Sequence, residues 1–128
     1  MKKLNYTILL SMLLLFGCSK SKFTHKLIII NKCSASIICH SAVTTYNTSN
    51  GTKSTVSFND PITINASFNL RNFKADKDIV LTDYFDKIQL EKSGIISSKD
   101  FRASNFWVKK ETGSNEIEWT LTVVDNLL

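Results

Sequence analysis

The segment ITINASFNL, residues Ile62–Leu70, alternates apolar and polar side chains at every position. A period of two places all of its apolar side chains on one face of a β-strand and all of its polar side chains on the other. Pro61 directly precedes the segment, and proline is tolerated at the first residue of a strand, where its missing N–H is not needed. One packed face and one solvated face are typical of antiparallel sheets, so the segment predicts a mainly β fold.

Upstream of this strand, the dipeptide Asn50-Gly51 separates two segments rich in Thr, Val, Tyr and Phe. Asn-Gly between such segments is typical of a β-hairpin closed by a type I′ turn. A hairpin folded about the dipeptide pairs Val43 with Phe58 on one face and places Tyr46 on the other face. The alternative is that the polar residues 47–54 form a long mobile loop.

A second hairpin is predicted at the C-terminus, between residues 106–110 and 116–124. One register pairs Trp107 with Trp119, but it places the apolar neighbours of Trp107 on a polar face. A shift of one residue pairs Phe106 with Trp119 and gathers the apolar side chains of both strands on one face. Because a one-residue slip exchanges the two faces of a strand, we expect the second register. It leaves Trp107 on the polar face.

The remaining segments also favour strands. Leu27–Ile30 is a β-branched run that suits a buried strand, and Ile37–Val43 follows it after a polar turn. A short helical turn is expected near residues 83–87, leading into an alternating strand at residues 88–91. Many short strands with few helical segments predict a mainly β fold, a compact antiparallel β-sandwich of about seven strands with at most one or two short helical turns. A small barrel is the alternative.

The first 17 residues have the organisation of an export signal. Lys2 and Lys3 form a basic start, and the apolar run Ile8–Phe16 is interrupted only by Ser11. A basic region, an apolar core of about 7–15 residues and a small residue before the cleavage site are typical of such signals. The run is too short for a bilayer-spanning helix, which needs about 20 apolar residues. We therefore expect residues 1–17 to be removed.

The export signal ends in Leu15-Phe16-Gly17-Cys18, which resembles the lipobox of bacterial lipoproteins. The resemblance implies that Cys18 is lipidated and becomes the first residue of a membrane-attached mature protein. Phe16 departs from the family pattern, which usually has a small residue there. Ser19 after the cysteine implies the outer membrane, and a tether without acidic residues implies a domain that faces the periplasm. The alternative is an ordinary cleaved signal peptide with an incidental cysteine.

Residues 18–24 are then a lipidated tether, and residues 25–128 are one β-sandwich domain of ordinary size. Without Lys2 and Lys3 the formal charge falls from +5 to about +3. The basic residues are scattered along the mature chain, whereas a nucleic-acid-binding protein has a clustered basic patch. We therefore expect no nucleic-acid partner.

Two further cysteines, Cys33 and Cys39, remain in the mature chain. Export leads to an oxidising compartment, where neighbouring cysteines tend to form disulfides. Residues 32–36 have the composition of a turn that would bring the two together. A disulfide is expected on these grounds, and the alternative is a pair of buried thiols, since cysteine is among the most buried residue types.

The sequence offers little for catalysis. Cys39-His40 is a nucleophile next to a base, but neighbouring residues of a strand point to opposite faces and are poorly placed to share a proton. Together with Cys33 and His25 they also lack the close paired spacing of zinc motifs. We expect no enzyme activity, no metal and no cofactor.

A binding role is the function that remains. Aromatic side chains on a polar face often mark partner surfaces, which makes Trp107 and Tyr46 the candidate binding residues. We expect a membrane-anchored, non-enzymatic module that binds a protein not yet identified, as an accessory subunit or an immunity-type inhibitor of an envelope protein. The alternative is a glycan-binding surface lipoprotein, in which the same two aromatics stack on sugar rings.

Replacing Cys39 or His40 by alanine is expected to lower the stability of the domain. Neither substitution is expected to abolish a specific activity. Melting temperatures followed by circular dichroism, beside an assay of biological function, test this. A variant that melts like the parent and yet loses a defined function would contradict the non-enzymatic prediction.

Overall fold

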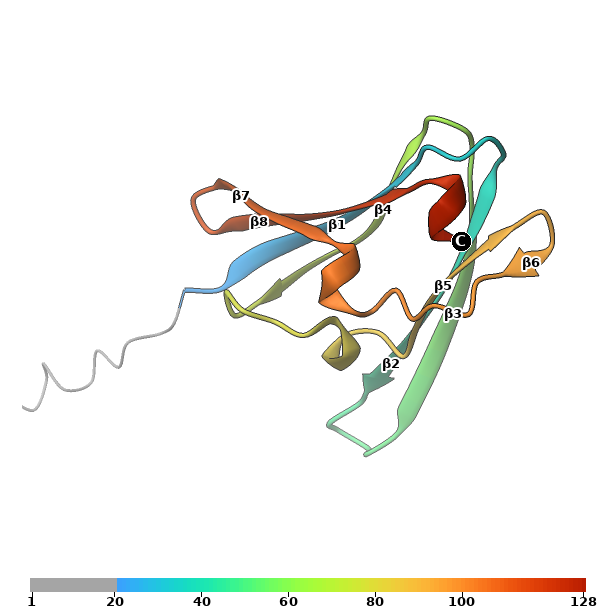
Figure 1. The fold of residues 1–128 in the computed structure, drawn as a ribbon. Coiled ribbons are helices and arrows are strands. Elements are labelled where there is room, and N and C mark those ends of the chain that lie inside the picture. The colour runs from blue at the N-terminus through green and yellow to red at the C-terminus, as the bar shows by residue number, and fades with distance from the viewer. Residues whose placement is uncertain (1–20) are drawn as a thin grey trace, which may run out of the picture.

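The computed structural model describes residues 21–128, so predictions for residues 1–20, lipidation of Cys18 among them, lie outside the described residues. The described chain forms eight strands in two four-stranded sheets, arranged as a sandwich (Figure 1). The prediction of a mainly β sandwich is confirmed, with one strand more than expected and three short 3-10 helices. The elements are β1 (Phe23–Asn31), β2 (Ile37–Tyr46), β3 (Lys53–Ile62), β4 (Ser67–Ala75), η1 (Leu81–Asp83), β5 (Lys87–Lys92), β6 (Ile95–Ile96), η2 (Ser104–Phe106), β7 (Val108–Gly113), β8 (Glu116–Val123) and η3 (Asp125–Leu127).

The strand order is β4-β1-β8-β7 in one sheet and β3-β2-β5-β6 in the other. All neighbouring strands are antiparallel except β1 and β8, which are parallel and place Leu27 beside Trp119 and Ile29 beside Leu121. The sequence did not predict this pair, because alternation identifies the buried face of a strand and not its direction. Strand β1 begins at Phe23, two residues before the predicted start of the domain.

The chain between β4 and β7 contributes β5 and β6 to the second sheet, and its connections with η1 and η2 lie between the two sheets (Figure 1). The helical turn expected near residues 83–87 lies slightly earlier, at Leu81–Asp83, and is followed by β5 as expected. Phe85 and Phe101 from these connections are buried in the core. The connections thus fill the space between the two sheets with aromatic side chains.

The alternating segment Ile62–Leu70 is not one strand, so that prediction is wrong. Ile62 ends β3 in one sheet, and Ser67 begins β4 in the other. Asn65, between them, has a φ of 60°, a left-handed conformation that asparagine adopts more readily than most residues. The apolar alternation continues through this turn, so periodicity alone does not reveal it.

The β2–β3 hairpin forms at the predicted place in a different register. Val43 pairs with Val56, two residues from the predicted partner Phe58, so the predicted faces are kept. The loop is closed by hydrogen bonds from the Asn47 N–H to the Thr52 C=O, 2.8 Å, and from the Gly51 N–H to the Asn47 C=O, 2.9 Å. The turn is therefore longer than the two-residue type I′ turn that Asn-Gly favours.

The predicted register of the C-terminal hairpin is also wrong. Trp119 pairs with Lys109, and Val108, which pairs with Thr120, is 70% exposed. Trp107 therefore lies on the inner face. The prediction failed because it placed Phe106 inside the strand, whereas Phe106 belongs to η2 and packs against the ring of Phe101, 5.0 Å between ring centroids.

Asn31, at the end of β1, is fully buried at the corner where the two sheets meet. Its side-chain amide donates to the C=O groups of Ala35 (3.0 Å) and Ile62 (2.9 Å), and its Oδ1 accepts from the Cys33 N–H at 2.9 Å. Its backbone N–H and C=O bind the β3–β4 connection at 3.0 and 2.8 Å. One residue thus joins two of the connections between the sheets, β1–β2 and β3–β4.

Replacing Asn31 by alanine is expected to lower the free energy of unfolding by about 3 kcal/mol, because it leaves the Cys33 N–H and the Ile62 C=O buried without their partners and also removes the hydrogen bond to the partly buried Ala35 C=O. Urea denaturation measures the change. The control is Asn72→Ala, at an exposed position of β4, where about 0.5 kcal/mol or less is expected. Equal effects of the two substitutions would contradict this role of Asn31.

Candidate functional site

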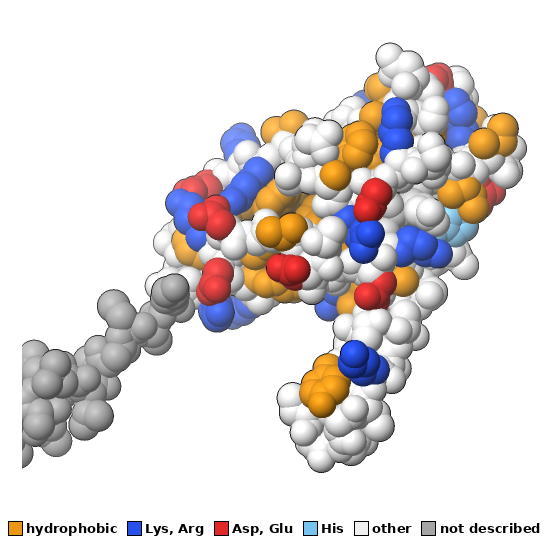
Figure 2. Space-filling model, turned by 60° about the horizontal axis from the view of Figure 1, so that its bottom comes forward, with side chains coloured by type: hydrophobic (Ala, Val, Ile, Leu, Met, Phe, Trp, Pro, Cys, Tyr) orange, Lys and Arg blue, Asp and Glu red, His pale blue; other side chains and the backbone are white. Residues whose placement is uncertain are grey.

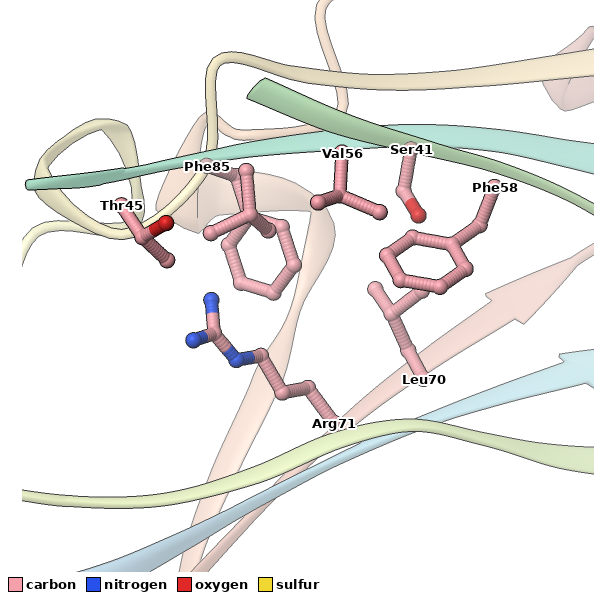
Figure 3. A pocket seen from close by; sticks show the side chains of 8 residues that line it. Ser41, Thr45, Val56, Phe58, Leu70, Arg71 and Phe85 are labelled. Atoms are coloured by element: carbon pink, nitrogen blue, oxygen red, sulfur yellow. The ribbon is translucent and has the colours of Figure 1, made fainter. Parts of the chain in front are cut away.

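A groove of about 240 Å³ lies between the inner face of the β2–β3 hairpin and strand β4. Figure 3 shows that Phe58 and Leu70 approach each other across it, and that the Arg71 guanidinium reaches in from β4. The lining is mostly apolar, with two hydroxyl groups and one charge. It consists of Ser41, Val43, Thr45, Val56, Phe58, Leu70, Arg71 and Phe85.

A β-bulge in β4 directs two consecutive side chains into this groove. Leu27 of β1 pairs with Arg71 and Ile28 pairs with Asn69, so Leu70 is an extra residue in β4. Both Leu70 and Arg71 are half-buried and line the groove. Bulges commonly re-aim a side chain in this way, and they are frequent next to functional sites.

The guanidinium of Arg71 is held by the chain around it. Its Nη1 donates to the Tyr84 C=O at 3.2 Å, and its Cζ lies 5.7 Å and 5.6 Å from the ring centroids of Phe73 and Phe85. Within residues 21–128, no carboxylate forms an ion pair with Arg71. The groove therefore contains a fixed positive charge that the described protein does not neutralise.

The apolar wall of the groove is open to solvent. Val56 is 45% exposed and Phe58 48% exposed, although both side chains lie on the inner face of the hairpin. Figure 2 shows the end of the hairpin as an arm that projects from the body of the domain. Among residues 21–128, strand β3 has only one neighbour in its sheet, β2, so its other edge is free of described strands. An exposed apolar surface beside a free strand edge is typical of a binding site.

Trp107, predicted to stand on a polar face, is buried in the core and only 6% exposed. Its Nε1–H donates to the C=O of Phe101 at 2.7 Å. The prediction of an exposed Trp107 followed from the wrong hairpin register, and it is wrong for the same reason. Trp107 is part of the packing between the sheets and offers no surface to a partner.

Tyr46 is 59% exposed near the tip of the β2–β3 hairpin, on a polar surface as predicted. It pairs with Lys53 across the hairpin. The groove is lined by Ser41, Val43 and Thr45 of the same strand, and side chains alternate between faces, so Tyr46 lies on the face opposite the groove. The two predicted aromatics therefore do not form one surface, and a binding role of Tyr46 stays a prediction.

The predicted disulfide is wrong, because the structure contains Cys33 and Cys39 as free, buried thiols. Cys33 lies in the turn that the Asn31 side chain closes, and Cys39 lies within the extended strand β2. Burial, with a smaller contribution from Asp60, raises the pKa of the Cys39 thiol to about 12. The thiol is therefore protonated at neutral pH and is not a nucleophile.

The histidines have structural partners. His40 lies on the face opposite Cys39, with Nδ1 2.6 Å from Asn59 Oδ1 and Nε2 2.7 Å from Glu91 Oε2. His25 is fully buried, and its Nδ1 accepts from the Trp119 indole N–H at 3.0 Å. In the described part of the chain, no group of three or more His, Cys, Asp or Glu side chains is arranged to hold a metal ion.

Sequence reasoning missed Arg71, although the sequence contains a trace of its role. The apolar alternation in β4 places Phe68 and Leu70 at even positions and then Phe73 and Ala75 at odd positions. Such a change of phase indicates a bulge, and Arg71 stands at the change. The phase change would have predicted that both Leu70 and Arg71 point inward.

Comparison with known protein families, curated proteins and solved structures finds no match to this chain. Its function is therefore inferred from the chemistry of the groove and from the N-terminal sequence. A groove with apolar walls, a fixed cation and a free strand edge beside it can hold a ligand. It contains no group that is placed to transfer a proton to one.

Proposed function

We propose that this chain is a lipid-anchored, non-enzymatic binding module, and that it binds a protein partner through the groove beside β3. The observation that carries the proposal is the exposed apolar wall of Val56 and Phe58 opposite the fixed guanidinium of Arg71. Within the class of envelope lipoproteins, such a module is an accessory subunit or an immunity-type inhibitor of an envelope protein.

Binding is favoured over catalysis by the composition of the groove. Its hydroxyl groups belong to Ser41 and Thr45, and none of the lining residues is a histidine, cysteine or carboxylate. A nucleophilic hydroxyl needs a base within hydrogen-bond distance to be activated. Neither hydroxyl has such a base among the residues that line the groove.

A protein partner is favoured over a glycan for two reasons. Glycan binding was expected to use Trp107 and Tyr46 together, but Trp107 is buried and Tyr46 lies outside the groove. The groove volume of about 240 Å³ is also below the roughly 300–1,000 Å³ of sites that enclose a small molecule. A groove of this size suits a few side chains of a larger partner.

The proposed anchor places the domain close to a membrane. Only four residues separate Cys18 from Phe23, the first residue of β1, so the tether spans at most about 20 Å. The tip of the β2–β3 hairpin lies well away from the start of β1 (Figure 1). In residues 21–128 there is no helix of the length and apolarity that crossing a bilayer requires. The location that we propose is the outer membrane, with the domain facing the periplasm.

A photo-reactive amino acid in place of Phe58 is expected to cross-link one discrete partner protein in intact cells, because this side chain lies at the mouth of the groove. The matched control is Ser57, the next residue of β3, which points to the opposite face. Adducts are detected on immunoblots and identified by mass spectrometry. The same adducts from both positions, or none from either, would contradict a partner at the groove.

Cys18→Ser is expected to abolish labelling of the protein by a fatty-acid precursor and to move it from the membrane fraction to the soluble fraction. Cys33→Ser is the control, because this substitution removes a buried thiol of the domain and leaves Cys18 in place for lipidation. Undiminished fatty-acid labelling of Cys18→Ser would contradict the proposed anchor.

A further inference from the structure

We infer that the groove selects an extended segment of its partner protein in which an aspartate or glutamate lies near an apolar residue, and that Arg71 binds the carboxylate. The inference rests on the proposed binding function and adds the chemistry of the partner. It follows from the charge, the shape and the position of the groove.

Charge complementarity calls for an acidic group. Arg71 is half-buried and forms no ion pair with a carboxylate of the described residues. A guanidinium has five N–H donors, and the described hydrogen bond, from Nη1 to the Tyr84 C=O, uses one of them. The donors that remain suit a carboxylate, which guanidinium groups bind with two parallel hydrogen bonds.

The guanidinium is also oriented before a ligand arrives. The hydrogen bond to Tyr84 and the rings of Phe73 and Phe85 restrict its rotation. A ligand therefore does not have to order this long side chain, which lowers the entropic cost of binding. The low dielectric of the surrounding rings strengthens the attraction between the two charges.

The free edge of β3 provides the means to hold an extended segment. An added strand forms main-chain hydrogen bonds with such an edge, and its alternate side chains enter pockets beside it. One apolar side chain of the segment would lie between Phe58 and Leu70, and a carboxylate would reach Arg71 (Figure 3). Since β3 runs from Lys53 to Ile62, it extends to both sides of the groove. An acidic side chain within a continuous segment therefore fits better than a C-terminal carboxylate.

The test uses the full chain, produced in cells, purified from membranes in detergent and exposed to a phage library of random dodecapeptides. Enriched peptides are expected to share an Asp or Glu close to an apolar residue. The best peptide is then synthesised in two forms, with its acidic residue or with the corresponding amide. On the unmodified protein, the amide form is expected to bind about tenfold more weakly, the usual contribution of a hydrogen-bonded charge.

Substitutions in β4 assign the effect to Arg71. Arg71→Gln is expected to bind the acidic and amide peptides equally, within about twofold, whereas Lys74→Gln is expected to keep the preference. Lys74 is an exposed cation of the same strand and does not line the groove. Circular dichroism checks that each variant is folded. If Arg71→Gln is unfolded, the comparison of the two peptides on the unmodified protein still decides the question.

Two results would overturn the inference and leave the proposed function in place. The first is that a partner is cross-linked from position 58 in cells, whereas the acidic and amide peptides bind the unmodified protein equally. The second is such a partner together with no enriched peptide. If instead no ligand of any kind depended on Phe58, the proposed function itself would fail.

Discussion

The buried amide of Asn31 fixes the corner from which both sheets extend. A fully buried asparagine is costly unless its donors and acceptors are paired, and here three side-chain bonds and two backbone bonds pair them. Because these bonds reach the β1–β2 and β3–β4 connections, each of which runs from one sheet to the other, they hold the strands in the diverging arrangement that Figure 1 shows. The β2–β3 hairpin leaves the corner in one direction and β4 in another, and the space between them becomes the groove.

The groove results from two departures from a regular sandwich. The hairpin extends beyond the sheet that faces it, so an apolar surface that would otherwise be covered, around Val56 and Phe58, meets solvent. The bulge in β4 then adds a cation at the edge of this surface by turning Arg71 inward. Each departure costs stability, since exposed apolar area and a half-buried charge are both unfavourable. Their coincidence at one place supports a binding function.

Local sequence patterns predicted where the strands and turns lie better than how the strands pair with one another. The Asn50-Gly51 hairpin was located correctly, but side-chain hydrogen bonds of Asn47 and Asn50 to Ser49 and Thr52 stabilise a longer turn and move the register by two residues. Alternation hid the corner at Asn65 and could not indicate that β1 and β8 run parallel.

The site was harder to predict than the fold. Trp107 was chosen for its residue type, and its exposure depended on a register that η2 alters. Arg71 was missed because it lies next to an apolar position in a strand, where an arginine ordinarily points to solvent. The bulge at Leu70 turns it inward, and the change of phase in the β4 sequence is the one signal of this bulge.

The parallel pair of β1 and β8 also determines when this chain can fold. Its first strand lies at the centre of a sheet that is completed by residues about 90 positions later, and long-range pairing of this kind is slow to form. In the export that we propose, the chain crosses the membrane from its N-terminus, so β1 would arrive long before its neighbour. The topology would then delay closure of the core until nearly the whole chain had been translocated. A lipid anchor at the N-terminus would hold the incomplete domain at the membrane during this interval.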